Sequence, residues 1–144
     1  MRYGRSGRLI RRLSADRADG GAVVLIGAGE VASGLTAEQL ATALERAPDD
    51  EVAAALCFLI GHYDNEPATP AVPRLLDLLD SADPALRAEA ADAIAHAISR
   101  GASPSEIARL RPDAETVVRE ALEREWDTYA REMLHDALAG LTRP

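Results

Sequence analysis

The chain has 144 residues, of which 47% are hydrophobic and 28% charged. This length is enough for one domain with its own core, and the hydrophobic content is too high for a chain that is disordered by composition. Aromatic residues make up only 3% and alanine is abundant, which favours closely packed helices over a β-sandwich. The net charge of −8 argues against a general nucleic-acid binder, because an acidic surface repels the phosphate backbone.

Arginines crowd the N-terminal segment, residues 1–17. All 16 basic residues of the chain are arginine, and six of them lie here against one acid, so the segment carries +5 and the remainder −13. We expect this segment to dock on the acidic body of the protein or on another copy of it.

The same segment lacks the features of a targeting signal. Its apolar run Leu9-Ile10 leads straight into Arg11-Arg12, whereas the apolar core of a signal peptide has about 7–15 residues. No run reaches the roughly 18 apolar residues of a membrane span. Cys57 is the single cysteine, so no internal disulfide forms, and we predict a cytoplasmic protein.

Three glycines, Gly27, Gly29 and Gly34, follow an apolar stretch at 22–26. A strand that runs into Gly-x-Gly and then a helix lets the backbone approach the pyrophosphate of a dinucleotide. The third glycine comes one residue late for that motif, and no second strand ends in an acid about 20 residues on. We expect a disrupted end of a helical array here, with a nucleotide site as the alternative.

The chain repeats with a period of 34 residues. The triplets Leu25-Ile26-Gly27, Leu59-Ile60-Gly61 and Ala93-Ile94-Ala95 follow one another at that spacing. Apolar anchors upstream keep the same register, the last after about ten extra residues: Ile10, Leu44, Leu78 and Leu122. We predict one domain, 1–144, of about four helical hairpins at about 1–34, 35–68, 69–102 and 113–144, with an inserted loop at 103–112.

Local signals place the helices within these units. Thr36 stands three residues before Gln39, the spacing of a capping box, and the second helix of that unit runs from about 51 to 61. In the next unit, Asp83-Pro84 predicts a capped helix start and Gly101 a helix end. The insertion predicts a loop and one helical turn near 106–110.

The third unit carries a recognisable pattern, Pro73-Arg74-Leu75-Leu76-Asp77-Leu78-Leu79 followed by Asp83-Pro84-Ala85-Leu86-Arg87. It resembles HEAT-type repeats, and more narrowly the short HEAT-like repeats of bacteria, including those of phycobilin lyases. The resemblance implies an all-α fold, an α-solenoid whose second helices line a concave face. It also implies that Arg87 and Arg131 tie adjacent units together.

No set of residues predicts a metal or cofactor site. His62 and His96 occupy equivalent positions in adjacent units, but neither belongs to the His-Glu dipeptides that HEAT-like metalloenzymes such as deoxyhypusine hydroxylase use. Two histidines without paired carboxylates make a poor metal site. Asp92 and His96 are spaced for an ordinary i, i+4 pair.

Catalytic residues are not expected either. Cys57 takes an apolar position of the repeat and is predicted to be a small buried side chain, and no serine lies in a nucleophile-elbow sequence. In the last unit, the acids Glu120, Glu123 and Glu125 indicate a solvated helix face. The aromatic residues Trp126 and Tyr129 near them indicate packing in the core or at a helix cap. We predict no catalytic residue, metal or cofactor.

A binding surface is the remaining candidate. If the second helices line a concave face, the predicted partner-binding residues are Phe58, His62, Glu89, Asp92, His96, Met133 and Asp136. The single phenylalanine, Phe58, suits an interface hot spot, with the alternative that the first unit covers it.

The leading hypothesis is a bacterial, non-enzymatic α-solenoid that captures a basic protein partner on this face, for example as an immunity or antitoxin-type protein. A second hypothesis is a structural subunit, whose basic N-terminus and acidic body join neighbouring copies head to tail. A third is a nucleotide-binding enzyme or a lyase-like protein.

Overall fold

Helices make up the regular structure of residues 36–62 and 69–143, which are the residues that the computed structural model describes. In chain order they are α2 (Ala37–Glu45), α3 (Asp50–His62), the 3₁₀ turn η2 (Thr69–Ala71), α4 (Val72–Leu78), α5 (Pro84–Ser99), α6 (Pro104–Leu110), α7 (Ala114–Arg124) and α8 (Thr128–Leu141). The predicted first unit, with its arginines and its Gly27 and Gly29 motif, lies outside the described residues. Among these helices, none combines the length and apolarity needed to cross a membrane.

The predicted helix boundaries depend on side chains that cap the backbone. At the start of α2 the backbone N–H of Gln39 donates to Thr36 Oγ1 at 3.1 Å, and Gln39 Oε1 accepts from the N–H of Thr36 at 2.9 Å. At α5 the carboxylate of Asp83 accepts from the N–H of Ala85 at 3.0 Å. Gly101 ends α5 with a φ of 120°, which L side chains rarely adopt. These predictions are confirmed.

The insertion is more ordered than the sequence analysis predicted. It forms a helix, α6, that begins at a second capping box, in which Ser103 Oγ accepts from the N–H of Glu106 at 3.1 Å. Ile107 then anchors the helix with a fully buried side chain. The Ser-x-x-Glu spacing was the available signal for this helix start.

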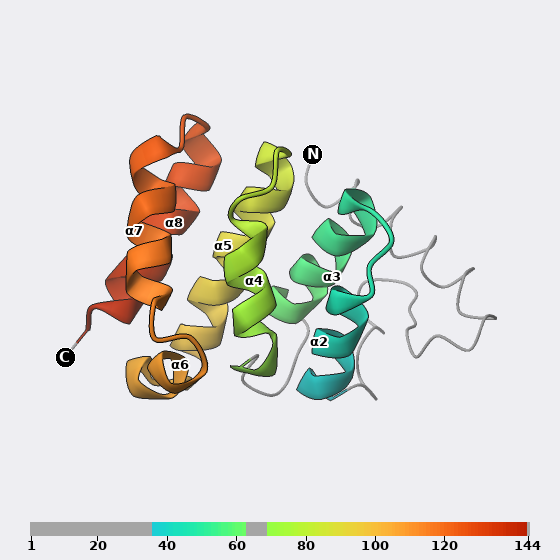
Figure 1. Cartoon of the computed structure of the whole chain (residues 1–144), viewed down its shortest axis with the longest axis horizontal. Helices are drawn as coiled ribbons and strands as arrows, with labels where there is room; N and C mark the ends of the chain where they lie inside the picture. The colour runs from blue at the N-terminus through green and yellow to red at the C-terminus, as the bar shows by residue number, and fades with distance from the viewer. Residues whose placement is uncertain (1–35, 63–68, 144) are drawn as a thin grey trace.

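The helices pack as hairpins in two layers (Figure 1). The first helices of the hairpins, α2, α4 and α7, form one layer, and the second helices, α3, α5 and α8, form the other. Within the second layer α5 packs closely against both α3 and α8, so it is the central element of the fold.

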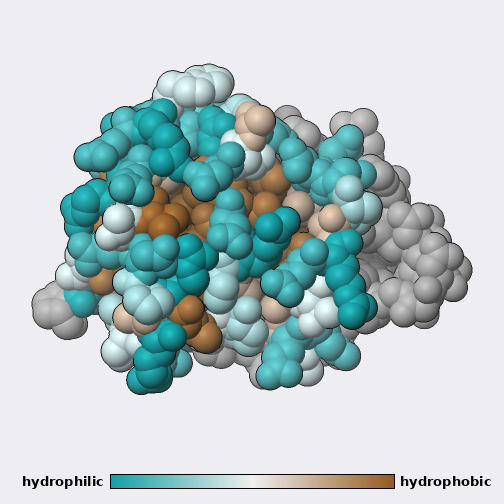
Figure 2. All heavy atoms as spheres, viewed as in Figure 1, coloured by the Kyte–Doolittle hydropathy of each residue, from teal (hydrophilic) through white to brown (hydrophobic). Residues whose placement is uncertain are grey.

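Alanine and leucine fill the space between the layers. Every residue from 52 to 61 is buried, as are Ala90, Ala91, Ala93 and Ile94 of α5. On the face formed by α2, α4 and α7, hydrophilic side chains surround apolar ones that show in the seam between α4 and α7 (Figure 2). The low aromatic content therefore reflects a core built by close helix contact.

Two glycines mark the closest helix contacts. A Cβ placed on Gly140 of α8 would lie 2.7 Å from Cγ2 and 3.0 Å from Cδ1 of Ile98 on α5. A Cβ on Gly61 of α3 would lie 3.5 Å from Cα of Ala93, which is an ordinary van der Waals distance. The α5–α8 contact therefore has no room for a side chain, whereas the α3–α5 contact does.

Substitution of these glycines by alanine tests this packing. We expect Gly140→Ala to lower the free energy of unfolding by about 1–3 kcal/mol, because overpacking outweighs the gain in helix propensity. The matched control, Gly61→Ala, has the same chemistry without the clash and should leave stability equal or slightly higher. Urea denaturation measures both, and an equally stable Gly140→Ala protein would contradict the close α5–α8 contact.

Candidate functional site

A groove runs between α5 and α8, and its lining residues belong to these two helices and to Arg143 just beyond α8. It encloses about 360 Å³ and is lined by Asp92, Ala95, His96, Ile98, Ser99, Asp136, Ala139, Gly140 and Arg143. Alanine and glycine contribute its smallest side chains, so the close approach of the two helices also shapes the groove. We call it the α5–α8 groove.

The polar groups of the groove come from one stripe on each helix. Nδ1 of His96 lies 3.2 Å from Oδ1 of Asp92 and 2.9 Å from its carbonyl oxygen, which confirms the predicted i, i+4 pair. Asp136 on α8 is exposed. The groove thus presents two carboxylates beside an imidazole, with Arg143 at its end.

The structure brings only part of the predicted partner-binding set to this surface. Asp92, His96 and Asp136 line the groove together. Asp92 is nevertheless buried, with an exposed fraction of 7%, as are Phe58 at 2%, Glu89 at 5% and Met133 at 9%. Phe58 is therefore not an open aromatic anchor; the alternative, that the first unit covers it, concerns residues outside the described ones. His62 is the last residue of α3, and its side chain lies outside the description.

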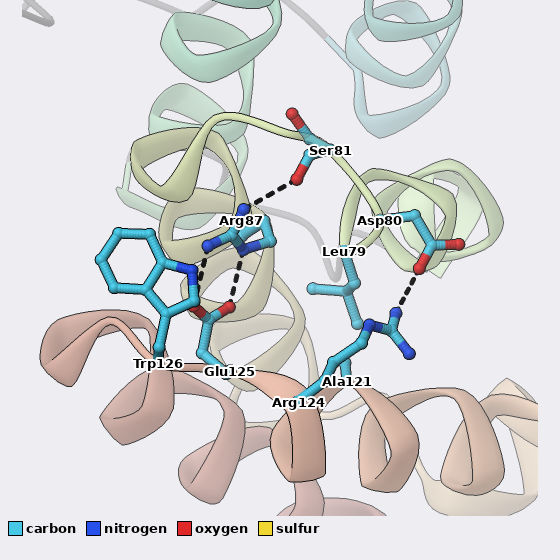
Figure 3. Close-up of a pocket in the computed structure, with 8 residues that line it drawn as sticks. All are labelled: Leu79, Asp80, Ser81, Arg87, Ala121, Arg124, Glu125 and Trp126. Carbon is cyan, nitrogen blue, oxygen red and sulfur yellow. Dashed lines mark hydrogen bonds and ion pairs between the residues drawn. The ribbon is translucent and has the colours of Figure 1, made fainter.

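A second hollow, which we call the Trp126 pocket, lies where α4 and α5 meet the end of α7 (Figure 3). It encloses about 210 Å³ and is lined by Leu79, Asp80, Ser81, Arg87, Ala121, Arg124, Glu125 and Trp126. Arg124 pairs with Asp80 across its mouth. Apart from Trp126, this pocket was not anticipated from the sequence as a surface feature.

A two-pronged ion pair holds the wall of the Trp126 pocket. Nε of Arg87 donates to Oε1 of Glu125 at 2.7 Å, and Nη2 donates to Oε2 at 2.9 Å. Nη1 of Arg87 donates to the carbonyl oxygen of Ser81 at 2.9 Å (Figure 3). Since Arg87 belongs to the third unit and Glu125 to the fourth, the inter-unit role expected of Arg87 is confirmed. The same expectation for Arg131 was wrong, because its hydrogen bonds go to the carbonyl oxygens of Leu122 and Glu125 within its own unit.

Two predictions about this region were wrong. Glu125 was expected on a solvated helix face, but it is 5% exposed. The helix ends at Arg124, and the extended backbone of Glu125 turns its carboxylate toward Arg87. Trp126 was expected in core or cap packing, but its ring is 73% exposed, with Cζ of Arg87 5.8 Å from the ring centroid. The available signal was the Asp127 cap of α8, which marks the preceding residues as a turn.

The electrostatics of the described residues point to structural ion pairs. The hydrogen bonds from Arg87 hold the pKa of Glu125 below its usual value, and the same bonds raise the pKa of Arg87. Both groups stay charged, so neither is suited to proton transfer. Burial, together with the charge of Glu89, raises the pKa of the Cys57 thiol, which keeps it from acting as a thiolate nucleophile. Within the described ranges, no three metal-ligating side chains gather into a site.

Comparison with known proteins identifies the class. The family model for HEAT repeats matches residues 37–139, so the chain belongs to the HEAT repeat family. No curated protein and no solved structure matched the chain. The helical hairpins are therefore the repeats of an α-solenoid, a fold that generally serves as a protein-binding scaffold and that some enzymes share.

The Arg87–Glu125 pair can be tested through its pH dependence. Glu125→Gln leaves the guanidinium without an anion, and we expect a loss of about 2–4 kcal/mol in unfolding free energy at neutral pH. Because folding lowers the pKa of Glu125, the stabilisation is present above its ordinary value of 4.5 and disappears as the pH falls through the lower folded value.

Urea denaturation of both proteins at neutral and acid pH therefore gives curves that converge in acid. Glu123→Gln, an exposed position in the last turn of α7, serves as the control and should change stability by less than about 0.5 kcal/mol. Equal losses from both substitutions would contradict the pair.

Trp126 is the single tryptophan of the chain, so the tryptophan fluorescence of the protein reports how exposed this side chain is. We expect acrylamide to quench its fluorescence almost as strongly in the folded protein as in urea, because the ring is 73% exposed. Trp126→Ala should cost about 1 kcal/mol or less, the worth of an exposed cation–π contact. The matched control, Leu79→Ala in the same pocket, should cost about 2–5 kcal/mol because that side chain is buried. A large loss from Trp126→Ala would show that the ring packs in the core.

Proposed function

We propose that the chain is a non-enzymatic α-solenoid that captures a basic protein partner on the concave face formed by its second helices. The observation that carries the proposal is the α5–α8 groove, a hollow on a repeat scaffold where carboxylates from two helices meet above small side chains. HEAT repeats commonly present such faces to other proteins, and partner recognition needs no catalytic group.

Charge supports a basic partner. Residues 18–144 carry a net charge of −13, so the electrostatic field of this part of the chain attracts cations and accelerates their association. Arginines of the scaffold, such as Arg87 and Arg111, already pair with carboxylates of this chain. A basic partner would therefore gain most binding energy by contacting the acidic side chains of the groove.

The proposed contact residues follow from exposure. His96 and Asp136 line the groove and would meet the partner directly, and Asp92, which is buried in the wall of the groove, would act through its ion pair with His96. Phe58, Glu89 and Met133 are buried, so they would support the residues of this surface instead of contacting the partner. His62 is kept in the proposed set through its place at the end of α3. Capture of a basic toxin in a bacterial cytoplasm by an immunity or antitoxin-type protein is the specific version that we favour.

The surface of the last hairpin bears on the hypothesis of a structural subunit that assembles head to tail. Along α7 and α8 the exposed side chains are almost all polar: Glu115, Thr116, Arg119, Glu120, Glu123, Arg124, Thr128, Arg131, Glu132, His135, Asp136 and Ala139. This end therefore offers no apolar face for stacking, and head-to-tail assembly would depend on charge. The nucleotide hypothesis rests on Gly27 and Gly29, outside the described residues.

Affinity capture from the source cells, followed by mass spectrometry, tests the proposal. The full chain at low salt should retain a basic protein in stoichiometric amount, and high salt or the substitution Asp136→Arg should release it. Glu120→Arg is the matched control, with the same charge change at an exposed site on α7. A partner that persists with Asp136→Arg and at high salt would contradict capture by the groove. Recovery of the bait alone as a multimer would favour the structural subunit.

A further inference from the structure

We propose that Trp126 and the pocket beside it form a dimer interface, in which the indole ring of each copy enters the Trp126 pocket of the other. The occupant of the pocket is therefore a second copy of this chain. The proposal goes beyond partner capture, because it concerns a surface that shares no lining residue with the α5–α8 groove.

The exposure of Trp126 points to a contact site. Its side chain is 73% exposed, and it is the one exposed aromatic side chain among the described residues. Tryptophan is enriched at the centres of protein interfaces, because covering its large ring removes much apolar area from water. A single exposed apolar residue is ordinary on a protein surface, but this one stands beside a pocket.

The pocket has the size and lining for one aromatic ring. It encloses about 210 Å³, and a cavity of about 150 Å³ is large enough to bind benzene. Leu79 and Ala121, whose side chains are buried, give it an apolar lining, and the ring of Trp126 stands at its edge (Figure 3). A ring that enters from a second copy would pack against these side chains and against Trp126 itself, where aromatic pairs gain beyond the area they bury.

The position of Trp126 beside its own pocket suits a two-fold axis. In a two-fold dimer every contact is made twice, so one surface must carry both members of each contact. Here the ring and the pocket lie side by side on one surface (Figure 3). A two-fold axis next to Trp126 places each ring over the pocket of the other copy, so a single patch supplies both contacts.

Charges around the pocket permit two acidic chains to meet there. The whole chain carries −8, which makes two copies repel each other. The lining of the pocket has two charges of each sign, arranged as the pairs Arg87–Glu125 and Arg124–Asp80. Like charges therefore do not dominate this patch, and it is a place where the repulsion between copies is weak.

The Arg124–Asp80 pair is also complementary to itself across a two-fold axis. Arg87 is held by three hydrogen bonds within its own copy. Both side chains of the Arg124–Asp80 pair, by contrast, are more than half exposed at the mouth of the pocket. This pair can exchange partners in the dimer, so that Arg124 of each copy binds Asp80 of the partner subunit.

Sedimentation velocity of the full chain tests the proposal without any other protein. We expect the dimer fraction to rise between about 1 µM and about 1 mM, with no larger species, because a two-fold contact closes at two copies. Trp126 is open to acrylamide in dilute solution, and over the same range its fluorescence should shift to the blue and become less quenched. A monomer at every concentration, or growth to larger multimers, would overturn the proposal.

Truncation of the ring measures its part in the contact. Trp126→Ala should raise the dissociation constant of the dimer by about 30-fold or more, the usual effect of removing an interface hot spot. Leu110→Ala is the matched control, because it removes the other exposed large apolar side chain, at the end of α6 and outside the pocket. It should leave the dissociation constant unchanged, and urea denaturation verifies that both variants fold. Equal dissociation constants for the two variants would contradict the interface.

A mixture of two charge variants decides whether the pair exchanges partners across the axis. Arg124→Asp places two acids at each pocket and Asp80→Arg two arginines, so each variant alone repels its own copies and should sediment as a monomer. An equimolar mixture sets opposite charges against each other and should form a heterodimer. Dimers of both variants alone, or a mixture that stays monomeric, would refute this arrangement. Because no partner takes part, the result is independent of whether affinity capture finds a basic protein.

Discussion

The close approach of α5 to its two neighbours is the constraint on which the rest of the structure depends. Helix axes come within 8–10 Å of each other only as far as the side chains between them allow. Here Gly61 faces Ala93 on one side of α5, and Gly140 faces Ile98 on the other. The missing side chain at Gly140 lets α8 approach α5 closely, α3 packs at ordinary contact distance on the other side, and the first helices cover this layer. The α5–α8 groove follows from the same contact, because the glycine that admits Ile98 also lines the hollow.

Arginines complement this apolar packing on the side of the first helices. Arg87 links two units through Glu125, and Arg131 donates from Nη1 to the carbonyl oxygens of Leu122 and Glu125 at 3.2 and 2.8 Å. Arg111 likewise reaches α4, with Nη1 3.0 Å from Oδ1 of Asp77. Guanidinium groups suit this role because one side chain can satisfy several acceptors in fixed directions. The positive charge of the described residues is thus partly engaged inside the scaffold, while Asp136 lies exposed at the groove.

This separation of charge connects the scaffold to its proposed role. Packing and ion pairs fix the hairpins relative to one another before any partner arrives, so the face between α5 and α8 is organised in advance. A preformed acidic face favours rapid association with basic proteins and makes that association sensitive to salt.

The sequence by itself determined the repeat architecture. Each hairpin can bury its apolar stripe only against the next hairpin, so apolar residues recur at the same positions in every repeat. Capping residues such as Thr36 and Asp83 likewise fixed helix starts, since a cap acts within a few residues of chain. Only the tertiary structure decided which polar residues are buried and which meet in a groove. Glu125 and Trp126 are neighbours in the chain, yet one turns inward to Arg87 and the other outward. Asp92 and Asp136 come together because α5 and α8 pack side by side. Burial depends on what other helices bring to a side chain, and a single stretch of sequence does not contain that information.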